Sequence, residues 1–404
     1  MEVLELYELS YSDLLLVSSN NVSLEELERV ELSSKAIMEA LGPMGPGLLS
    51  IIGVPKAAAL RWNLLPLARK LALMDPNHRK LILKDHKLGS DVPLKNPDRK
   101  VSSFAMQIKY SNDIEDTRVN SEHELVSGFD NLGNGFRELG ICMMELGLRL
   151  ARICDRAIGG QELEQSLLES GTAKARLIHY HSVLEKTILV QEARPKKAVS
   201  SKRIRIGDEV KRSGGDDSSN LWQQWHYDYG IFTVLTAPLF VLASNAQASE
   251  EREEECAYPN GHTYLQIFDP SKKNVFMVKA SPESFIIQVG ESADIISRGK
   301  LCATLHSVAR PPKFEHLSRE TFVLFLQPAW NKTFSTEDYP MNQISGTSKE
   351  IKCDDESESR RITEEIQKIV PPLAMRLKNS MTFADFSRET TKQYYGGTGL
   401  QSNK

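Results

Sequence analysis

One short segment of the chain pairs two residue types that bind metal ions in proteins. It reads Trp225-His226-Tyr227-Asp228, so His226 and Asp228 are two residues apart. In an extended strand such residues project from the same face, and the imidazole and the carboxylate can take neighbouring positions on one metal ion. The pattern alone is weak evidence, because a surface histidine beside a counter-ion fits it too.

A third candidate ligand is His306, in the strand-like segment Ala-Thr-Leu-His-Ser-Val of residues 303–308. A lone strand histidine is more often structural than a ligand. Enough strand-like segments separate His306 from His226, however, to return the chain to the same part of a sheet. Two histidines and one carboxylate on one side of a metal leave three positions open, which is the arrangement of non-haem Fe(II) oxygenases.

The segment that begins at Arg319 places a charge on the inner face of a predicted barrel strand. Arg319 and Thr321 share that face by alternation. A buried guanidinium is costly unless it meets an anion. It binds a carboxylate through two parallel hydrogen bonds, to which the Thr321 hydroxyl can add a third. An arginine that reaches solvent from a strand end is the other interpretation, which we favour less because Arg319 follows His306 by 13 residues.

In this order, the motifs His-x-Asp, distal His and Arg-x-Thr resemble those of the plant-type 2-oxoglutarate- and Fe(II)-dependent dioxygenases related to isopenicillin N synthase. The segments AIMEALGPMGPGLLSIIGVP and LQIFDPSKKNVFMVKASPESFIIQVGE resemble that family's N-terminal region and the strand pair before the distal histidine. The resemblance implies a mainly β fold with flanking helices, a double-stranded β-helix (jelly-roll) barrel. It also implies O₂ as oxidant, release of succinate and CO₂, Fe(II) held by His226, Asp228 and His306, and 2-oxoglutarate held by Arg319 and Thr321.

The chain departs from the family pattern at three points. His226 and His306 are 80 residues apart, which is longer than usual, and Arg-x-Thr stands where Arg-x-Ser is customary. Where many relatives carry Asn-Tyr-Tyr before the His-x-Asp motif, this chain has His179-Tyr180-His181. Tyr180 or His181 is therefore either a further contact of the 2-oxoglutarate carboxylate or an ordinary strand residue.

The elements that must position these residues change from predicted helices to predicted strands near residue 165. Residues 1–165 are expected to be mainly helical, with a capping box at Ser23 and a long amphipathic helix over 136–158. Residues 166–340 contain many short runs rich in β-branched and aromatic residues, among them ADIIS at 293–297, and predict the catalytic barrel. Residues 341–404 are expected to form a charged linker with a C-terminal helix or tail.

Two polar stretches, at about 185–220 and 243–260, are expected to be loops inserted between barrel strands. The first contains the basic cluster RPKKAVSSKRIR and the second contains EEREEE. The basic cluster could instead be a nuclear-import or anion-binding patch.

Composition narrows the possible partners. Of 404 residues 40% are hydrophobic, and the formal net charge of −4 gives no electrostatic footprint for nucleic acid. No apolar run reaches the length of a membrane span. Five scattered cysteines without a C-x-x-C motif favour neither a disulfide framework nor a cysteine zinc site. The acidic N-terminal segment is unlike a targeting peptide, so a cytoplasmic location is expected, with a nuclear one as the alternative. The protein is also expected to be a monomer.

The function predicted from these features is oxidation of a small organic molecule, with hydroxylation as the default and desaturation or ring closure as variants. One alternative is an oxidase of the same fold that does not use 2-oxoglutarate. Another is a catalytically silent barrel that acts as a binding or scaffold protein. No motif identifies the substrate, although five aromatic residues near the metal motif could line a pocket or belong to the core: Trp222, Trp225, Tyr227, Tyr229 and Phe232.

Overall fold

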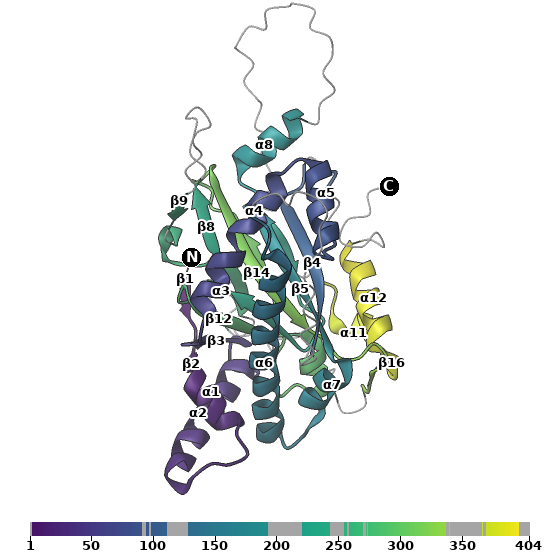
Figure 1. Cartoon of the computed structure of the whole chain (residues 1–404). Helices are drawn as coiled ribbons and strands as arrows, with labels where there is room; N and C mark the ends of the chain where they lie inside the picture. The colour runs from purple at the N-terminus through teal and green to yellow at the C-terminus, as the bar shows by residue number, and fades with distance from the viewer. Residues whose placement is uncertain are drawn as a thin grey trace, which may run out of the picture.

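The computed structural model describes residues 2–90, 94–96, 98–110, 128–192, 220–242, 254–256, 258–269, 272, 274–336, 339, 366 and 369–395. These residues form two main β-sheets, which share a hydrophobic core, and a short two-stranded pair. Helices cover the outer side of the larger sheet (Figure 1).

The larger sheet is built from nine strands. They are β2 (Glu8–Ser10), β3 (Leu48–Ile52), β4 (Val101–Lys109), β5 (Thr172–Tyr180), β7 (Phe232–Thr236), β8 (Leu239–Leu242), β9 (Glu254–Cys256), β12 (Phe285–Val289) and β14 (Leu317–Leu326). Their order is β2-β3-β12-β7-β14-β5-β4, while β8 pairs with β14 and β9 pairs with β8. β14 is therefore central, with β5 along one edge and β7 and β8 along the other.

The smaller sheet has five strands: β1 (Glu2–Glu5), β6 (Leu221–His226), β10 (Leu265–Asp269), β11 (Asn274–Lys279) and β13 (His306–Ala309). Their order is β1-β11-β10-β13-β6. A short separate pair joins β15 (Thr333–Phe334) to β16 (Met381–Thr382) near the C-terminal end of the described chain.

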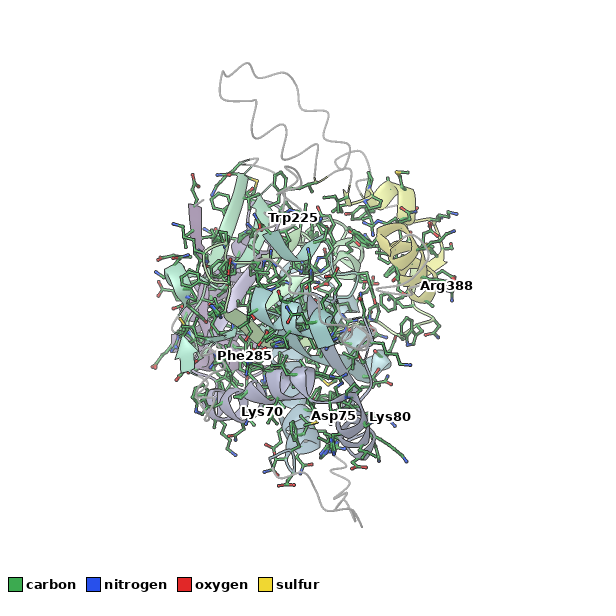
Figure 2. The ribbon with its side chains drawn as sticks, turned by 90° about the horizontal axis from the view of Figure 1, so that it is seen from above. Lys70, Asp75, Lys80, Trp225, Phe285 and Arg388 are labelled. Atoms are coloured by element: carbon green, nitrogen blue, oxygen red, sulfur yellow. The ribbon has the colours of Figure 1, made fainter. Side chains whose placement is uncertain are left out.

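The helices are α1 (Tyr11–Ser18), α2 (Leu27–Leu41), α3 (Ala57–Leu64), α4 (Pro66–Leu73), α5 (Pro76–Asp85), α6 (Leu132–Ile158), α7 (Glu162–Ser170), α8 (Val183–Glu192), α9 (Glu291–Ile296), α11 (Leu373–Arg376) and α12 (Phe383–Tyr395), with the 3₁₀ turns η1 (Leu24–Glu26) and η3 (Pro259–Gly261). In Figure 2, Lys70 of α4 and Asp75 and Lys80 at α5 lie on the opposite side of the molecule from Trp225 of β6. Arg388 of α12 lies at the right of the same view, away from both groups. No helix in the described part of the chain combines the length and apolarity needed to cross a bilayer.

α6 braces the larger sheet because glycines let it approach closely. A Cβ atom added at Gly147 would lie 2.0 Å from Cδ1 of Leu326 in β14, and one added at Gly140 would lie 2.9 Å from Cγ1 of Ile108 in β4. The long helix expected over 136–158 is confirmed, and it begins four residues earlier.

Alternation along β14 divides the interior into two cores. Phe322 and Leu324 belong to the core shared with α6, whereas Val323 packs with Ile178 and Leu265 between the two sheets. The same alternation directs Arg319 away from α6 and into the space between the sheets. This is the inner face that the sequence predicts for it.

The expected fold class, a double-stranded β-helix with flanking helices, is confirmed by this architecture. The capping box at Ser23 is present as well. The strand expected at 293–297 is wrong, because residues 291–296 form the helix α9. The backbone N–H groups of Glu291 and Ser292 donate to the carbonyl oxygens of Asp228 and Gly230, not to a neighbouring strand.

The N-terminal region contributes more than helices. β1 joins the smaller sheet, while β2, β3 and β4 join the larger one. The boundary expected between residues 165 and 166 falls inside α7. Both expected insertions also differ from plain loops where they are described, because α8 covers 183–192 and β9 covers 254–256. Residues 193–219 and 243–253, with the basic and most of the acidic cluster, lie outside the described residues, as does most of 341–368.

Candidate metal centre and cavity

The three predicted ligands come together where β6 and β13 pair. His226 ends β6, His306 begins β13, and the two residues are direct partners in the sheet register. Nε2 of His226 lies 3.7 Å from Oδ1 of Asp228, and Nε2 of His306 lies 3.7 Å from Oδ2 of the same carboxylate. The candidate ligand atoms all lie within 4.8 Å of one another. This convergence is the arrangement predicted from the spacing of the three residues.

Both imidazole rings are held with Nε2 toward the carboxylate. Nδ1 of His226 donates to the carbonyl of Gln224 at 2.7 Å, and Nδ1 of His306 donates to the carbonyl of Thr304 at 3.0 Å. With the proton on Nδ1, Nε2 of each ring carries the lone pair that can bind a cation, as in most metal-bound histidines; Nε2 of His226 also lies 2.9 Å from Nε2 of Gln223. Burial, together with the neighbouring His306, lowers the pKa of His226 to about 4, so its ring is neutral near pH 7.

The segment that carries Asp228 is clamped by the start of α9. The N–H of Glu291 donates to the Asp228 carbonyl at 2.8 Å, and the N–H of Ser292 donates to the Gly230 carbonyl at 3.0 Å. These bonds need close backbone contact, since a Cβ atom on Gly290 would lie 2.3 Å from the Gly230 oxygen. Backbone groups and glycines therefore fix the segment that carries Asp228, and the Thr233 hydroxyl donates to Oδ2 of its carboxylate at 2.6 Å. The His-x-Asp pattern reveals neither contact.

A cavity leads from the three candidate ligands into the space between the sheets, and Arg319 lines it. The Arg319 side chain is buried, its Nε donates to the Thr263 carbonyl at 3.2 Å, and its Cζ lies 5.1 Å from the centre of the Tyr180 ring. Burial lowers the pKa of Arg319 and raises that of Tyr180. A buried guanidinium of this kind is stabilised by an anion, which the cavity could receive.

Tyr180 and His181 face opposite sides of β5. Tyr180 lines the cavity, and its hydroxyl donates to Oε1 of Gln223 at 2.9 Å, while Nε2 of Gln223 lies 2.9 Å from Nε2 of His226. His181 points away from the cavity, where its Nε2 lies 2.8 Å from the Ser102 hydroxyl. The alternative that His181 contacts the co-substrate therefore finds no support in this geometry.

Thr321 shares the inner face of β14 with Arg319, as predicted, but its hydroxyl has another partner. It donates to the Thr236 carbonyl at 3.3 Å and lies 3.4 Å from the Thr236 hydroxyl. It is also absent from the described residues that line the cavity. In this structure Thr321 links β14 to β7.

Arg176 is a charged cavity residue that the sequence analysis missed. It lines the cavity from β5, opposite Val323 of β14, with its Cζ 4.8 Å from the centre of the Phe325 ring. An adjoining cavity shares Arg176 and Asp228 with the first and reaches Tyr394 of α12. Two-residue alternation from Tyr180 through 178 to 176 could have placed Arg176 on this face.

The five aromatic residues near the metal motif separate into three groups. Trp222 and Trp225 line the main cavity, and Tyr227 and Tyr229 line the adjoining one. Phe232 belongs to the core beneath α6. The backbone N–H of Tyr227 donates to the Tyr394 hydroxyl at 3.2 Å, which ties α12 to the cavity mouth.

Comparison with known proteins gives similarity in structure only. No family model matches the sequence, and no curated protein is detectably similar to it. A full-length Neurospora crassa protein, solved in complex with alpha-KG, matches with a TM-score of 0.50 and 15% identity, over 82% of this chain and 89% of that one. The dioxygenase for auxin oxidation (DAO) in rice matches with a TM-score of 0.51 and 16% identity, over 89% of this chain and 95% of that one. The chain therefore has the double-stranded β-helix fold of the 2-oxoglutarate- and Fe(II)-dependent dioxygenases, with a buried His/Asp/His triad in it.

Proposed function

We propose that this chain is an Fe(II)- and 2-oxoglutarate-dependent dioxygenase that oxidises a small organic molecule. The observation that carries the proposal is the placement of two complementary groups in one cavity. Two imidazoles and one carboxylate, from His226, His306 and Asp228, lie together at one part of it, and the Arg319 guanidinium lies elsewhere on its wall. The first set suits a divalent cation, and the second suits a carboxylate.

The donor set fits iron, because two imidazoles and one carboxylate bind one side of the ion and leave positions for co-substrates. When bound, iron would supply the redox chemistry that reduces O₂ with electrons from 2-oxoglutarate. Arg319 would hold the far carboxylate of 2-oxoglutarate. The Tyr180 ring beneath the guanidinium would support it by a cation–π contact, and the Tyr180 hydroxyl would be a further hydrogen-bond donor to that carboxylate. Per turnover, one O₂, one 2-oxoglutarate and one substrate C–H bond yield succinate, CO₂ and a hydroxylated product.

This proposal is tested by product release. Purified protein supplied with Fe(II), 2-oxoglutarate and O₂ should form succinate in a metal-dependent way, at least slowly without primary substrate. His226→Ala, Asp228→Ala and His306→Ala should each abolish that release. His86→Ala is the matched control, since His86 is a buried histidine at the end of α5, outside the cavity. Full succinate release by all three site variants would overturn the ligand assignment.

We further infer that the primary substrate carries an anionic group that Arg176 binds. Arg319 and Arg176 both line the main cavity, but of these two only Arg176 also lines the adjoining cavity beneath α12. Phe325 of β14 is opposite Thr233, whose hydroxyl donates to Oδ2 of Asp228 at 2.6 Å. Arg176 lies nearer this end of β14 than Arg319 does, because it is opposite Val323, whereas Arg319 is four residues further from Phe325. One guanidinium is thus placed for 2-oxoglutarate and the other for a second anion, in a cavity that Trp225 also lines.

The substrate class is tested with paired compounds. Aromatic or aliphatic carboxylic acids should stimulate succinate release more than their neutral amides, because only the acids pair with the guanidinium. Arg176→Met should reduce or reverse that preference and leave the affinity for 2-oxoglutarate unchanged. Equal stimulation by acids and amides in the wild-type protein would contradict an anionic substrate without touching the oxygenase assignment.

A further inference from the structure

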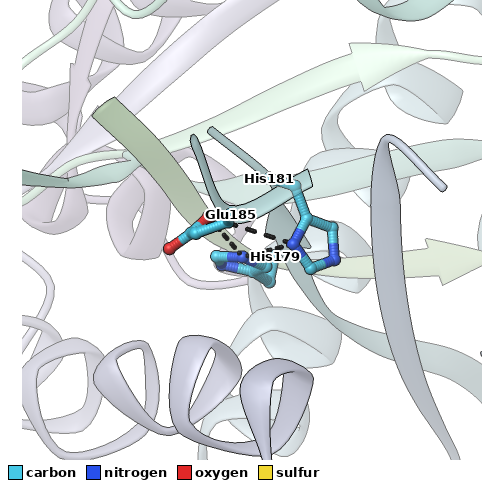
Figure 3. Close-up of side chains that lie close together, drawn as sticks. All are labelled: His179, His181 and Glu185. Atoms are coloured by element: carbon cyan, nitrogen blue, oxygen red, sulfur yellow. Dashed lines mark hydrogen bonds and ion pairs between the residues drawn. The ribbon is translucent and has the colours of Figure 1, made fainter. Parts of the chain in front are cut away.

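A second cluster of metal-binding residue types lies on the other face of β5. It consists of His179, His181 and Glu185, which are 0%, 2% and 3% exposed. The histidines alternate with Tyr180 and so point away from the cavity, toward the first turn of α8, which carries Glu185. Figure 3 shows the three head groups directed toward one another.

The separations within this cluster match those of ligands around one small cation. Nε2 of His179 lies 3.2 Å from Nδ1 of His181 and 3.2 Å from Oε2 of Glu185, and the last two atoms are 3.9 Å apart. A point equidistant from three atoms so arranged lies about 2.0 Å from each, which is the length of a zinc–nitrogen or zinc–oxygen bond.

Each of the three groups also contacts another polar side chain through the atom that does not face the centre of the cluster. Nδ1 of His179 contacts Oε2 of Glu320 at 2.7 Å, and Nε2 of His181 lies 2.8 Å from the Ser102 hydroxyl. Oε1 of Glu185 accepts from Nε of Arg69 at 2.8 Å. A carboxylate behind a histidine ring and a donor behind a carboxylate are the outer contacts that orient metal ligands in proteins.

Two buried carboxylates flank one histidine ring of the cluster, an arrangement that favours a cation between them. Glu185 and Glu320 contact opposite edges of the His179 ring, and both are buried. Arg69 pairs with Glu185 on the side away from the ring. Either a proton on His179 or a metal ion can fill the position between the three head groups. The two occupants make opposite predictions for metal content.

We propose that His179, His181 and Glu185 bind a second divalent cation, of the zinc class, separate from the iron centre. A set of two histidines and one glutamate is a known zinc donor set, which leaves the fourth position to a further ligand. The ion would cross-link the end of β5 to α8 and, through Arg69, to α4. It would therefore stabilise the wall of the barrel, with no part in oxidation. This proposal does not depend on the proposed function.

The decisive measurement is metal content in a chain whose iron centre has been removed. Asp228→Ala/His306→Ala protein, freed of metal and then dialysed against Zn²⁺, should retain one equivalent of zinc by inductively coupled plasma mass spectrometry. Adding Glu185→Gln, which keeps the shape and removes the charge, should lose that equivalent. Adding His86→Ala should not.

A second measurement covers the case in which the triple variant fails to fold. Co²⁺ added to the folded Asp228→Ala/His306→Ala protein should give the visible absorption of a low-symmetry site with nitrogen ligands, which competing Zn²⁺ removes. If this folded protein binds neither Zn²⁺ nor Co²⁺, the cluster holds a proton and the proposal is overturned. Unchanged zinc binding in a folded Glu185→Gln variant would overturn it as well.

Discussion

Replacing Arg319 by lysine tests how the cavity recognises 2-oxoglutarate. Arg319 is 2% exposed, and its guanidinium lies over the Tyr180 ring. Lysine keeps the positive charge that a buried carboxylate needs, but it cannot form two parallel hydrogen bonds with that carboxylate. The substitution therefore removes one charge-assisted hydrogen bond from the complex and leaves the charge balance intact.

The magnitude follows from the burial of this contact. A hydrogen bond to a charged group in a desolvated site contributes about 1.5–3 kcal/mol. Because each 1.4 kcal/mol is a factor of about ten in affinity, the dissociation constant for 2-oxoglutarate should rise roughly ten- to a hundredfold. Tyr180→Phe keeps the ring beneath the guanidinium and removes the hydroxyl, so its effect should be smaller.

Calorimetric titration of 2-oxoglutarate into Mn(II)-loaded protein measures this affinity in air, because Mn(II) accepts the same nitrogen and oxygen donors. Arg176→Lys is the matched control, being the other guanidinium on the cavity wall. Our assignment predicts weakened binding in Arg319→Lys and wild-type binding in Arg176→Lys. The reverse pattern would exchange the two roles. No change in either variant would favour the same-fold oxidase, which needs no 2-oxoglutarate.

Three further predictions concern the support of the site. Gly290→Ala should weaken iron binding about tenfold or more, because its Cβ would lie 2.3 and 3.0 Å from two backbone oxygens. Gly89→Ala is the control and should bind iron normally, because its Cβ would meet nothing within 4 Å. Equal iron affinities of the two variants would contradict the role of α9 in holding the Asp228 segment. Nη1 of Arg376 donates to Oε2 of the buried Glu291 at 2.7 Å. Arg376→Met should therefore lower the free energy of unfolding by about 3–5 kcal/mol in urea titrations, because it leaves this carboxylate buried without its cation. Adding Glu291→Leu should restore part of that loss. Burial raises the pKa of Asp294 to about 6, so its contribution to stability is most favourable below pH ~4 and declines by up to about 3 kcal/mol as the pH rises through 6. Unfolding of metal-free Asp294→Asn should lack this decline, and a constant difference from wild type at pH 4 and pH 7 would refute the assignment.

Most of the predictions about the site rested on the alternation of side chains along strands. His226 and Asp228 are two residues apart, Arg319 lies on an inner face, and the structure places both as expected. The same rule, applied to β5, would have assigned Arg176 to the cavity and His181 to the opposite face. Arg176 was not considered and His181 was left with two alternatives, because the family pattern, and not the alternation, guided the interpretation of that segment.

Long-range contacts explain what the sequence did not predict. The β-branched run at 293–297 has strand composition, yet the segment forms α9 because its N–H groups cap the loop that holds Asp228. β4 lies in a region expected to be helical, and it is a strand because Phe104 and Ile108 pack beneath α6 while its edge pairs with β5. Local propensity cannot reveal partners that are far away in the chain.

The measurement that tests the central claim most directly is an anaerobic titration of the wild-type protein with Fe(II) and 2-oxoglutarate. The account predicts a visible charge-transfer band that needs both additives and is absent from Asp228→Asn, which keeps the shape of the ligand and removes its charge. A band equally strong in Asp228→Asn would contradict the role of that carboxylate. Folded wild-type protein that shows no band with both additives present would contradict the assignment as a 2-oxoglutarate-dependent dioxygenase.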